Sequence, residues 1–326
     1  DDAAKAAATP EDLTALSATV REYTGRQITH VVAVTCTGSI VPGLEFHIMQ
    51  ALGLPANTQR LSIQFMGCFG AVSGVRCASA LAAENPRNRV LVVCTELCTL
   101  HMQLNDKIDN LIATALFADG SGAFVVGCDP TPTERPLFAV HSCSSYVIPK
   151  TLDMMAWDMK KEGLHIGLAK EIAGEIFNII GDFVDDMLKY AGDERHSGHR
   201  VAAKDCNCAL HPGGPLILNP IQNVLNVPMV GDGHGGGDID PRAPTAESWE
   251  ILREYGNMSS ATLVFVMDRI REKAFRSGKW TPLVAFGPGL STEGALLRAV
   301  FPAPNADGTY PRVAVAAEQP AGAQKQ

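Results

Sequence analysis

The chain has 326 residues, of which 46% are hydrophobic and 19% charged, so it can bury a large core in one big domain or two fused ones. Its formal net charge is −8, from 27 basic and 35 acidic residues, and no stretch carries the basic footprint of a nucleic-acid-binding protein. The longest apolar runs are too short or too interrupted to span a bilayer. We therefore expect a closely packed α/β enzyme with no nucleic-acid partner and no membrane segment.

Nine cysteines are spread along the chain, and an odd number argues against a disulfide framework. No secretory signal opens the sequence, so we expect a cytoplasmic protein, with a removed organelle-targeting peptide as the open alternative. Residues 1–23 resemble a ragged end that enters an amphipathic helix. Residues 303–326 are rich in Ala and Pro, and we expect them to form a disordered tail.

Strands and helices alternate in the first half of the chain, which we place at residues 1–135. Buried strands are expected over 29–37, 60–66, 89–97 and 122–129, and helices over 43–54, 70–84 and 109–119. The helix over 70–84 consists of small residues and ends before Asn85 and Pro86. This alternation implies crossover connections and a largely parallel, buried sheet.

The second half, placed at residues 136–302, repeats the order of strand, turn and buried helix. Helices are expected over about 167–191, 213–225 and 256–275, and strands over 205–211, 282–290 and 294–301. A Gly/Asp-rich loop over 230–244 separates two of these elements, and we expect it to be mobile and exposed. The similar layout of the halves indicates an internal duplication.

Cys68 is the first candidate for chemistry, in the stretch QFMGCFGAVSG that covers residues 64–74. It lies at a predicted strand-to-helix turn, where backbone N–H groups and the helix dipole converge and stabilise a thiolate. We expect a nucleophilic cysteine with a lowered pKa. The alternative is a buried structural thiol, since free cysteine is commonly buried.

A nucleophilic thiolate also needs a partner that handles protons and donors for the oxyanion. His211 follows a predicted strand in ALHPGGP, and Asn257 starts a predicted helix in EYGNMSSA. Taken singly, each is more simply read as a turn histidine or an N-cap asparagine. Together with Cys68 they form a Cys–His–Asn constellation at the ends of elements.

Two other kinds of site are disfavoured by local sequence. The residues around Cys68 read GCFG, which differs from the Cys-Gly-Ser/Ala-Cys-Trp/Tyr signature of papain-like proteases. Metal binding is not expected either, because two Cys/His groups lack the spacing of standard zinc sites. These groups are Cys206, Cys208 and His211, and Cys94, Cys98 and His101.

Five segments in a fixed order carry a resemblance to a known family. They are GCFGAVSGVRCASALAAENPRNRVLVVCTEL, ATALFADGSGAFVVG, HPGGP, EYGNMSSA and FGPGL, within residues 28–301. The sequence resembles the type III polyketide synthases, the chalcone/stilbene synthase family within the thiolase-like condensing enzymes. The resemblance implies a thiolase-like, duplicated αβαβα layered fold. It also implies malonyl-CoA and an acyl-CoA starter as substrates, with no metal or redox cofactor.

The resemblance assigns roles to four residues. Cys68 matches the nucleophile that carries the starter and the growing chain as a thioester. His211 and Asn257 match the pair that holds the thioester carbonyl of malonyl-CoA and stabilises the enolate formed when CO2 leaves. Phe117 matches a gatekeeper phenylalanine between the CoA tunnel and the cavity.

The resemblance also implies a set of substrate-binding residues around the cavity. They are Cys36, Thr37, Cys98, His101, Trp157, Ile166, Ser259, Gly287, Pro288 and Gly289. Cys36, Cys98 and His101 stand where plant chalcone synthases have threonine, and Trp157 stands where they have glycine. These departures resemble bacterial, fungal or algal members, and the added bulk would shrink or redirect the cavity. The expected products are phloroglucinol or a triketide pyrone, with alkylpyrones or resorcinols from long acyl starters still open.

Assembly and alternatives also follow from the resemblance. Val41 falls where the family places a residue that reaches the partner's cavity, so a homodimer is expected. The family's N-terminal strand and helices, which help to bind the CoA phosphates, have no counterpart in this sequence. Cys36 could be a second reactive thiol or a buried lining residue. The competing functions are a ketoacyl-acyl-carrier-protein synthase III-like condensing enzyme and a degenerate, non-enzymatic thiolase-fold scaffold.

The Cys68 assignment predicts that Cys68→Ala abolishes chain extension while the fold survives, because the acyl chain loses its only proposed attachment atom. Product formation from CoA thioesters, measured beside the circular dichroism spectrum, checks this. Retained condensation, or loss of folding alone, would contradict the assignment.

Overall fold

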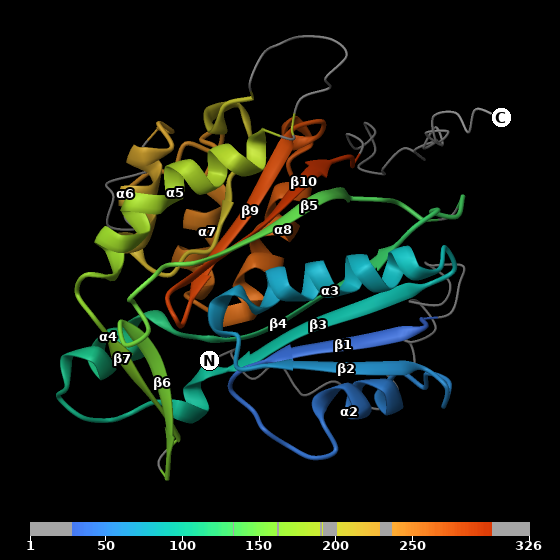
Figure 1. Cartoon of the computed structure of the whole chain (residues 1–326), viewed down its shortest axis with the longest axis horizontal. Coiled ribbons are helices and arrows are strands. Elements are labelled where there is room, and N and C mark those ends of the chain that lie inside the picture. The colour runs from blue at the N-terminus through green and yellow to red at the C-terminus, as the bar shows by residue number, and fades with distance from the viewer. Residues whose placement is uncertain are drawn as a thin grey trace.

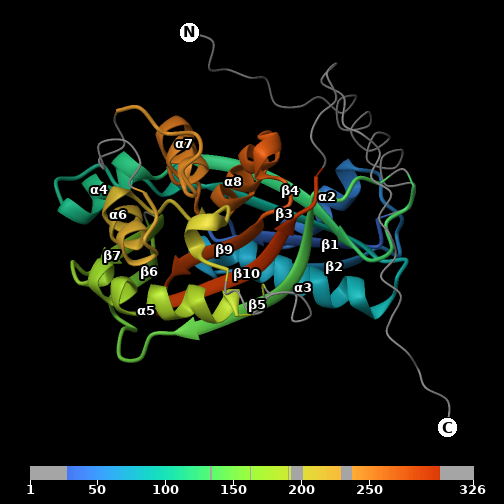
Figure 2. The same cartoon turned by 90° about the horizontal axis from the view of Figure 1, so that it is seen from above.

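The computed structural model describes residues 28–132, 134–161, 163–189, 191, 201–228 and 237–301. Its described elements stack in five layers that alternate between helices and sheets (Figures 1 and 2). From one side to the other these are helix α2, a first four-stranded sheet, helices α3 and α8, a second four-stranded sheet, and helices α5 and α6. The expected αβαβα layering is therefore present, and each apolar sheet face is covered by helices.

The first sheet belongs to the first half of the chain and has the order β2-β1-β3-β4. Its strands are β1 His30–Thr35, β2 Gln59–Gln64, β3 Arg89–Leu97 and β4 Asp119–Gly127. β1 runs parallel to β2 and β3, whereas β4 is antiparallel to β3. All six residues of β1 are buried, because helices α2 and α3 contact it and β2 and β3 flank it.

The second sheet has the order β5-β10-β9-β8. Its strands are β5 Phe138–Val147, β8 Ala209–Leu210, β9 Trp280–Gly287 and β10 Ser291–Ala299. Only the pair β8–β9 is parallel, since β10 is antiparallel to both β9 and β5. The prediction of a largely parallel sheet, made for the first half of the chain, is confirmed there by the parallel pairs β1–β2 and β1–β3, but it does not hold for the second sheet. The physical reason is that β9 and β10 are joined by a short turn, which permits an antiparallel pair and leaves no room for a crossover.

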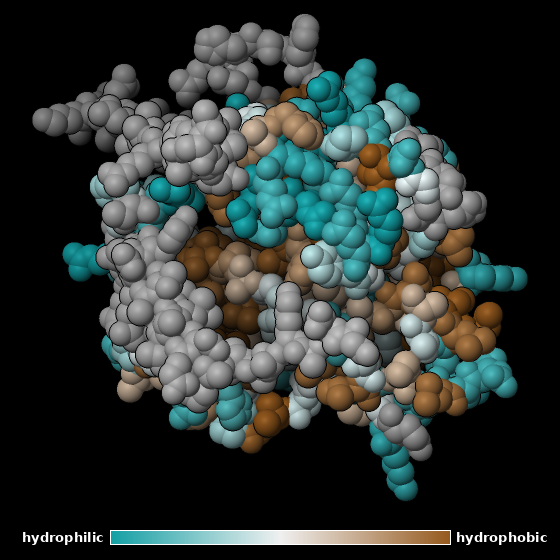
Figure 3. Space-filling model, turned by 180° about the vertical axis from the view of Figure 1, so that it is seen from behind, coloured by the Kyte–Doolittle hydropathy of each residue, from teal (hydrophilic) through white to brown (hydrophobic). Residues whose placement is uncertain are grey.

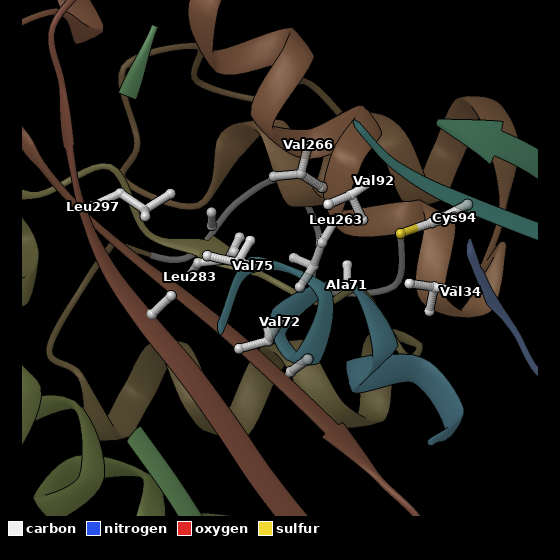
Figure 4. Close-up of a cluster of buried hydrophobic side chains, with 14 of the residues drawn as sticks. Val34, Ala71, Val72, Val75, Val92, Cys94, Leu263, Val266, Leu283 and Leu297 are labelled. Carbon is white, nitrogen blue, oxygen red and sulfur yellow. The ribbon is translucent and has the colours of Figure 1, made fainter. Parts of the chain in front are cut away.

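Helices α3 Gly70–Glu84 and α8 Thr262–Arg271 form the central layer. α3 contacts strands of both sheets, and α8 contacts β4 and β8. The small residues of α3 allow this close approach: a Cβ at Gly74 would lie 2.9 Å from Cγ1 of Val92. Figure 4 shows the resulting core, in which Val72 and Val75 of α3 lie near Leu263 and Val266 of α8.

The helices of the two outer layers are α2 Leu44–Ala51, α5 Ile172–Leu188 and α6 Pro215–Val224. Two further helices are α4 Ile108–Leu116 and α7 Ala246–Tyr255. α7 was not predicted, because its sequence AESWEILREY is rich in charge. Its buried Glu247 accepts two hydrogen bonds from the fully buried Arg276, at 2.9 and 3.0 Å, so the apparent polarity of the helix is satisfied internally.

A second unpredicted element is a two-stranded antiparallel hairpin, β6 Met155–Lys160 and β7 Gly163–Leu168, which forms a sheet of its own. The sequence does contain a signal for it, since Met155, Trp157 and Met159 alternate with other residues on β6, and β7 alternates in the same way. The hairpin packs against α4 and lies at the end of the molecule that carries the candidate site (Figure 1).

Several expected boundaries shift. The strand expected over 205–211 is reduced to the two residues of β8, because a 3-10 turn occupies Ala203–Asp205. The helix expected over 256–275 begins only at Thr262, after a 3-10 turn at Ser259–Ala261. The expected N-terminal helix, the tail over 303–326 and part of the loop over 230–244 lie outside the described residues. Within the described ranges, no helix is both long and apolar enough to cross a bilayer.

The packing of the central helices predicts which substitutions lower the free energy of unfolding. Leu263→Ala should lower the free energy of unfolding by about 2–5 kcal/mol, because Leu263 is fully buried between the sheets and truncation leaves a cavity. Leu216→Ala, on the exposed side of α6, is the matched control and should change it by less than about 0.5 kcal/mol. Urea denaturation of both variants checks this, and equal effects would contradict the layered packing.

Candidate active site

Cys68 lies in the 3-10 turn Gly67–Phe69, between the end of β2 and the start of α3. Gly67 has φ +73°, and a Cβ there would lie 2.3 Å from Cδ of Pro288. Only glycine therefore lets this turn pack against the β9–β10 loop. Gly287 meets the same turn from the other side, since its Cβ would lie 2.5 Å from the Phe69 ring. The sequence thus places the thiol at the predicted turn, braced by a second, distant loop.

The charge state of Cys68 differs from the prediction. Desolvation by burial, with the carboxylate of Glu96 acting in the same direction, raises the pKa of the Cys68 thiol to about 12. Hydrogen bonds from the side chains of Ser259 and Asn257 act in the opposite direction but do not offset the lost water. The expectation of a lowered pKa is therefore wrong, and Cys68 is a neutral thiol at rest.

Asn257 reaches Cys68 from the other half of the chain. It lies before α8 rather than at the helix start, in an isolated bridge with Phe117. Its N–H donates to the Leu116 carbonyl at 2.7 Å, and its own carbonyl accepts from Ala118 N–H at 2.9 Å. The side-chain Oδ1 accepts from Ser259 N–H at 2.9 Å. The amide nitrogen is thereby left as a donor, and its hydrogen bond to Cys68 acts to lower the pKa of that thiol.

His211 directly follows β8, and its backbone N–H donates to the Val284 carbonyl of β9 at 2.8 Å. The side chain is only 2% exposed, and neither ring nitrogen has a hydrogen-bond partner among the described residues. Desolvation by burial lowers the pKa of His211 to about 3. The imidazole is therefore neutral, with one free donor and one free acceptor. A buried polar group without a partner calls for an explanation, and a bound substrate supplies one.

Glu96 is a residue of the site that sequence reasoning missed. Its carboxylate is fully buried, and Oε2 accepts hydrogen bonds from Cys36 N–H at 3.0 Å and from the N–H and hydroxyl of Thr37 at 3.2 and 2.8 Å. Oε1 accepts from the Ser260 hydroxyl at 2.5 Å. The signal was available: an acidic residue inside the apolar strand RVLVVCTEL rarely lies buried without a specific role.

A cavity of about 330 Å³ opens beside these groups. Nine of the residues predicted to bind substrate line it, namely Cys36, Thr37, Cys98, His101, Phe117, Trp157, Ile166, Ser259 and Pro288. Gly287 and Gly289 do not line it; they shape the loop that holds Pro288, and Gly289 adopts φ +103°. The lining residues that were not predicted are Phe65, Gly67, Thr99, Met102, Gln103, Asn110, Ala113, Thr114, Met159 and Leu164. Half of them come from α4 and the β6–β7 hairpin, whose place in the fold the sequence did not reveal.

The three polar candidates are not among the lining residues of this cavity, but two of them adjoin it. Cys68 adjoins the lining residue Gly67, and Asn257 is bridged to Phe117 and bonded to Ser259. The Phe117 ring contacts Trp157 edge-on, with centroids 5.7 Å apart. Two aromatic rings in contact therefore form part of the cavity wall, and one of them belongs to the residue that is bridged to Asn257.

Cys36 has a defined place beside the candidate nucleophile. Its sulfur accepts a hydrogen bond from Gly67 N–H at 3.0 Å. Desolvation by burial raises the pKa of the Cys36 thiol to about 12. The geometry favours the lining interpretation of Cys36 over a second reactive thiol. Within the described ranges, no three His, Cys, Asp or Glu side chains gather in an arrangement that could hold a metal ion.

The burial of His211 predicts a pH dependence. The unfolded chain binds a proton on this histidine below pH 6.5, whereas the folded chain does so only near pH 3, so folding becomes less favourable as the pH falls through this window. The free energy of unfolding of the wild type, relative to His211→Gln, should fall by about 1.4 kcal/mol per pH unit. Urea denaturation between pH 7 and pH 4 measures this, and parallel profiles would contradict a buried neutral imidazole.

Comparisons with known proteins agree with this geometry. The model of the chalcone and stilbene synthase N-terminal domain matches residues 4–130, and that of the C-terminal domain matches residues 139–301. "Probable polyketide synthase 1" of Dictyostelium discoideum is 41% identical over 84% of this chain, which spans 8% of that protein. "Type III polyketide synthase C" of Arabidopsis thaliana is 32% identical over 83% of this chain and 67% of that protein. "Type III polyketide synthase 10" of rice is 34% identical, over 86% and 69%.

A solved structure is also similar. The C-terminal type III polyketide synthase domain of 'Steely1', a type I/III hybrid from Dictyostelium, superposes with a TM-score of 0.77 and 38% identity, over 90% of this chain and 77% of that one. The predicted thiolase-like fold is confirmed, and nothing in these matches favours a ketoacyl-acyl-carrier-protein synthase III. Because both family models match in order across the layered halves that carry Cys68, His211 and Asn257, the chain belongs to the chalcone and stilbene synthase family of type III polyketide synthases.

Proposed function

We propose that this chain extends a Cys68-bound acyl starter with malonyl-CoA by decarboxylative Claisen condensation and then releases a cyclised polyketide. The observation that carries the proposal is the buried His211 imidazole, whose two nitrogens have no partner among the described residues, in a fold that also sets Asn257 beside Cys68. Its family membership supplies the reaction class. The reaction uses CoA thioesters as substrates and needs no further cofactor.

Loading starts from neutral groups. Because the pKa of Cys68 is raised and that of His211 is lowered, the two do not form an ion pair at rest. We propose that Cys68 gives its proton to the His211 imidazole as the sulfur attacks the starter thioester. The new C–S bond joins the acyl group to Cys68, the bond to the CoA sulfur breaks, and the proton is returned to the leaving CoA thiolate.

Extension then uses the same donors. When malonyl-CoA binds, the bond between its α-carbon and its carboxylate breaks, CO2 leaves, and the electron pair forms an enolate on the thioester oxygen. The imidazole N–H of His211 and the amide N–H of Asn257 are positioned by buried backbone contacts, so they can stabilise this charge without reorganising. The enolate carbon attacks the carbonyl carbon of the Cys68 thioester and forms the new C–C bond, while the C–S bond to Cys68 breaks. The Cys68 thiolate leaves and takes a proton, and the chain, two carbons longer, is now a thioester of CoA.

The cavity bears on product size. At about 330 Å³ it lies at the small end of ligand pockets, and the Phe117 and Trp157 rings and the His101 imidazole occupy part of its wall. We propose a short, malonyl-derived product such as phloroglucinol or a triketide pyrone. Alkylpyrones or alkylresorcinols, made from long acyl starters, are the other outcome of the test below.

A homodimer is proposed as the working assembly. Val41, the residue expected to reach the partner, is 94% exposed. Other exposed large apolar side chains lie near it in the chain or in the neighbouring elements of the site: Ile40, Phe65, Leu97, Leu100, Leu104 and Ile108. Figure 3 shows hydrophobic residues gathered in a hollow on the face opposite to that of Figure 1. Apolar surface of this kind is typical of a protein interface.

The nine cysteines are all free, which supports a reducing, cytoplasmic compartment.

Incubation with malonyl-CoA, alone and with a ladder of acyl-CoA starters, followed by mass spectrometry, tests the function. We expect a polyketide and CO2 release from the wild type, and at least about a hundredfold slower CO2 release from His211→Ala and Asn257→Ala, because each removes a donor to the enolate. Cys68→Ala is the matched control, since it should lose products while retaining decarboxylation. Unchanged CO2 release from either donor variant would remove that residue from its role, and no product with any starter would contradict the function.

A further inference from the structure

His101 connects three segments that are distant in the sequence. It ends the 3-10 turn Cys98–His101 that follows β3. Its Nε2 lies 2.7 Å from the carbonyl oxygen of Thr37, in the loop after β1. Its Nδ1 lies 3.1 Å from the backbone nitrogen of Leu164, in β7. The imidazole therefore joins the loop beside Cys36 to the β6–β7 hairpin.

These two contacts determine the protonation of the ring. A carbonyl oxygen can only accept a hydrogen bond, so Nε2 carries the proton and donates it to Thr37. A backbone N–H can only donate, so Nδ1 is unprotonated and accepts from Leu164. Both bonds exist together only in the neutral Nε2–H tautomer. No other side chain of this size combines a donor and an acceptor on opposite sides of one rigid ring.

The hairpin is shaped to receive the ring. Gly163 begins β7 with φ +113°, a conformation that side chains rarely adopt. A Cβ on Gly163 would lie 2.8 Å from Nδ1 of His101. The absence of a side chain at Gly163 therefore lets the imidazole reach the Leu164 N–H.

The hairpin held in this way is a wall of the cavity. Trp157 and Met159 of β6 and Leu164 and Ile166 of β7 all line it. The hairpin forms a sheet of its own and shares no strand pairing with the two main sheets. Its position must therefore be fixed by side-chain contacts, and the His101–Leu164 hydrogen bond is one of them.

We propose that His101 is a positioning residue that clamps the β6–β7 hairpin through two opposed hydrogen bonds and thereby limits the length of the acyl chain that the cavity admits. The clamp itself stands on the hydrogen-bond geometry, and its effect on chain length rests on the proposed function. This role differs from simple filling of space, because it depends on where the ring donates and accepts rather than on its volume.

Three substitutions at His101 distinguish an effect of its hydrogen bonds from an effect of its side-chain volume. His101→Asn retains an acceptor near the Nδ1 position and loses the donor at Nε2. His101→Gln retains a donor near the Nε2 position and loses the acceptor for Leu164. His101→Phe retains the ring volume and loses both bonds. Lys160→Gln, on the exposed part of β6, is the control for a change in the hairpin that leaves the clamp intact.

Hydrogen exchange of peptides that cover residues 155–168 measures the clamp directly, without substrate. We expect exchange about fivefold faster in His101→Gln and His101→Phe, the factor for one lost hydrogen bond of about 1 kcal/mol. His101→Asn keeps the bond to Leu164 but loses the bond to Thr37, so it should show a smaller increase, and Lys160→Gln should exchange at the wild-type rate. Equal exchange in all five proteins would overturn the clamp. A far-ultraviolet spectrum and melting temperature, measured on each variant, identify any general unfolding.

The length of acyl-CoA starter that each variant accepts measures the effect of the clamp on the cavity. With malonyl-CoA and the acyl-CoA ladder, the clamp predicts that His101→Gln and His101→Phe accept longer starters than the wild type, and that His101→Asn, with one bond left, falls between them and the wild type. A role through bulk predicts the reverse order, with His101→Phe like the wild type and His101→Asn most permissive, and that result would overturn the proposal. If wild type and variants all fail to make polyketides while hydrogen exchange follows the predicted order, the proposed function and the chain-length effect fail but the clamp stands.

Discussion

The buried carboxylate of Glu96 is the constraint on which the site depends. It gathers four hydrogen bonds, from the loop after β1 through Cys36 and Thr37, and from the turn before α8 through Ser260. A carboxylate at this depth is tolerated only because every bond is made, and losing one donor would leave a costly buried charge. Glu96 therefore locks the first half of the chain to the second at the place where Cys68 must meet Asn257.

Burial, with the same carboxylate as a smaller cause, explains why the site is neutral at rest. The carboxylate opposes a thiolate on Cys68 and on Cys36, and burial acts in the same direction. His211 is kept uncharged by burial as well. In the proposed reaction, negative charge develops only when a thioester is attacked or CO2 leaves. The N–H groups of His211 and Asn257 then donate hydrogen bonds to the charged oxygen. A dry, neutral site of this kind favours the enolate over a resting ion pair and limits side reactions with water.

The cavity is assembled around this core from less regular pieces. The Phe117 backbone is bridged to Asn257, so an aromatic side chain of the cavity wall and the proposed enolate donor belong to one rigid unit. The β6–β7 hairpin closes the opposite wall through His101 and through the contact of Trp157 with Phe117. Chemistry is thus placed on the rigid layers, whereas the features that bear on substrate size lie on a hairpin outside both main sheets.

The sequence by itself determined the central elements and the catalytic candidates. The helix at Gly70–Glu84 and the strand at Arg89–Leu97 have the expected boundaries, because their periodicity and the Asn85-Pro86 stop are local signals. The family motifs located Cys68, His211 and Asn257. Only the tertiary structure decided the raised pKa of Cys68, the hub at Glu96, the antiparallel β9–β10 pair and the His101 clamp. Desolvation, strand direction and hydrogen bonds between distant segments arise from packing in space, which local sequence patterns do not encode.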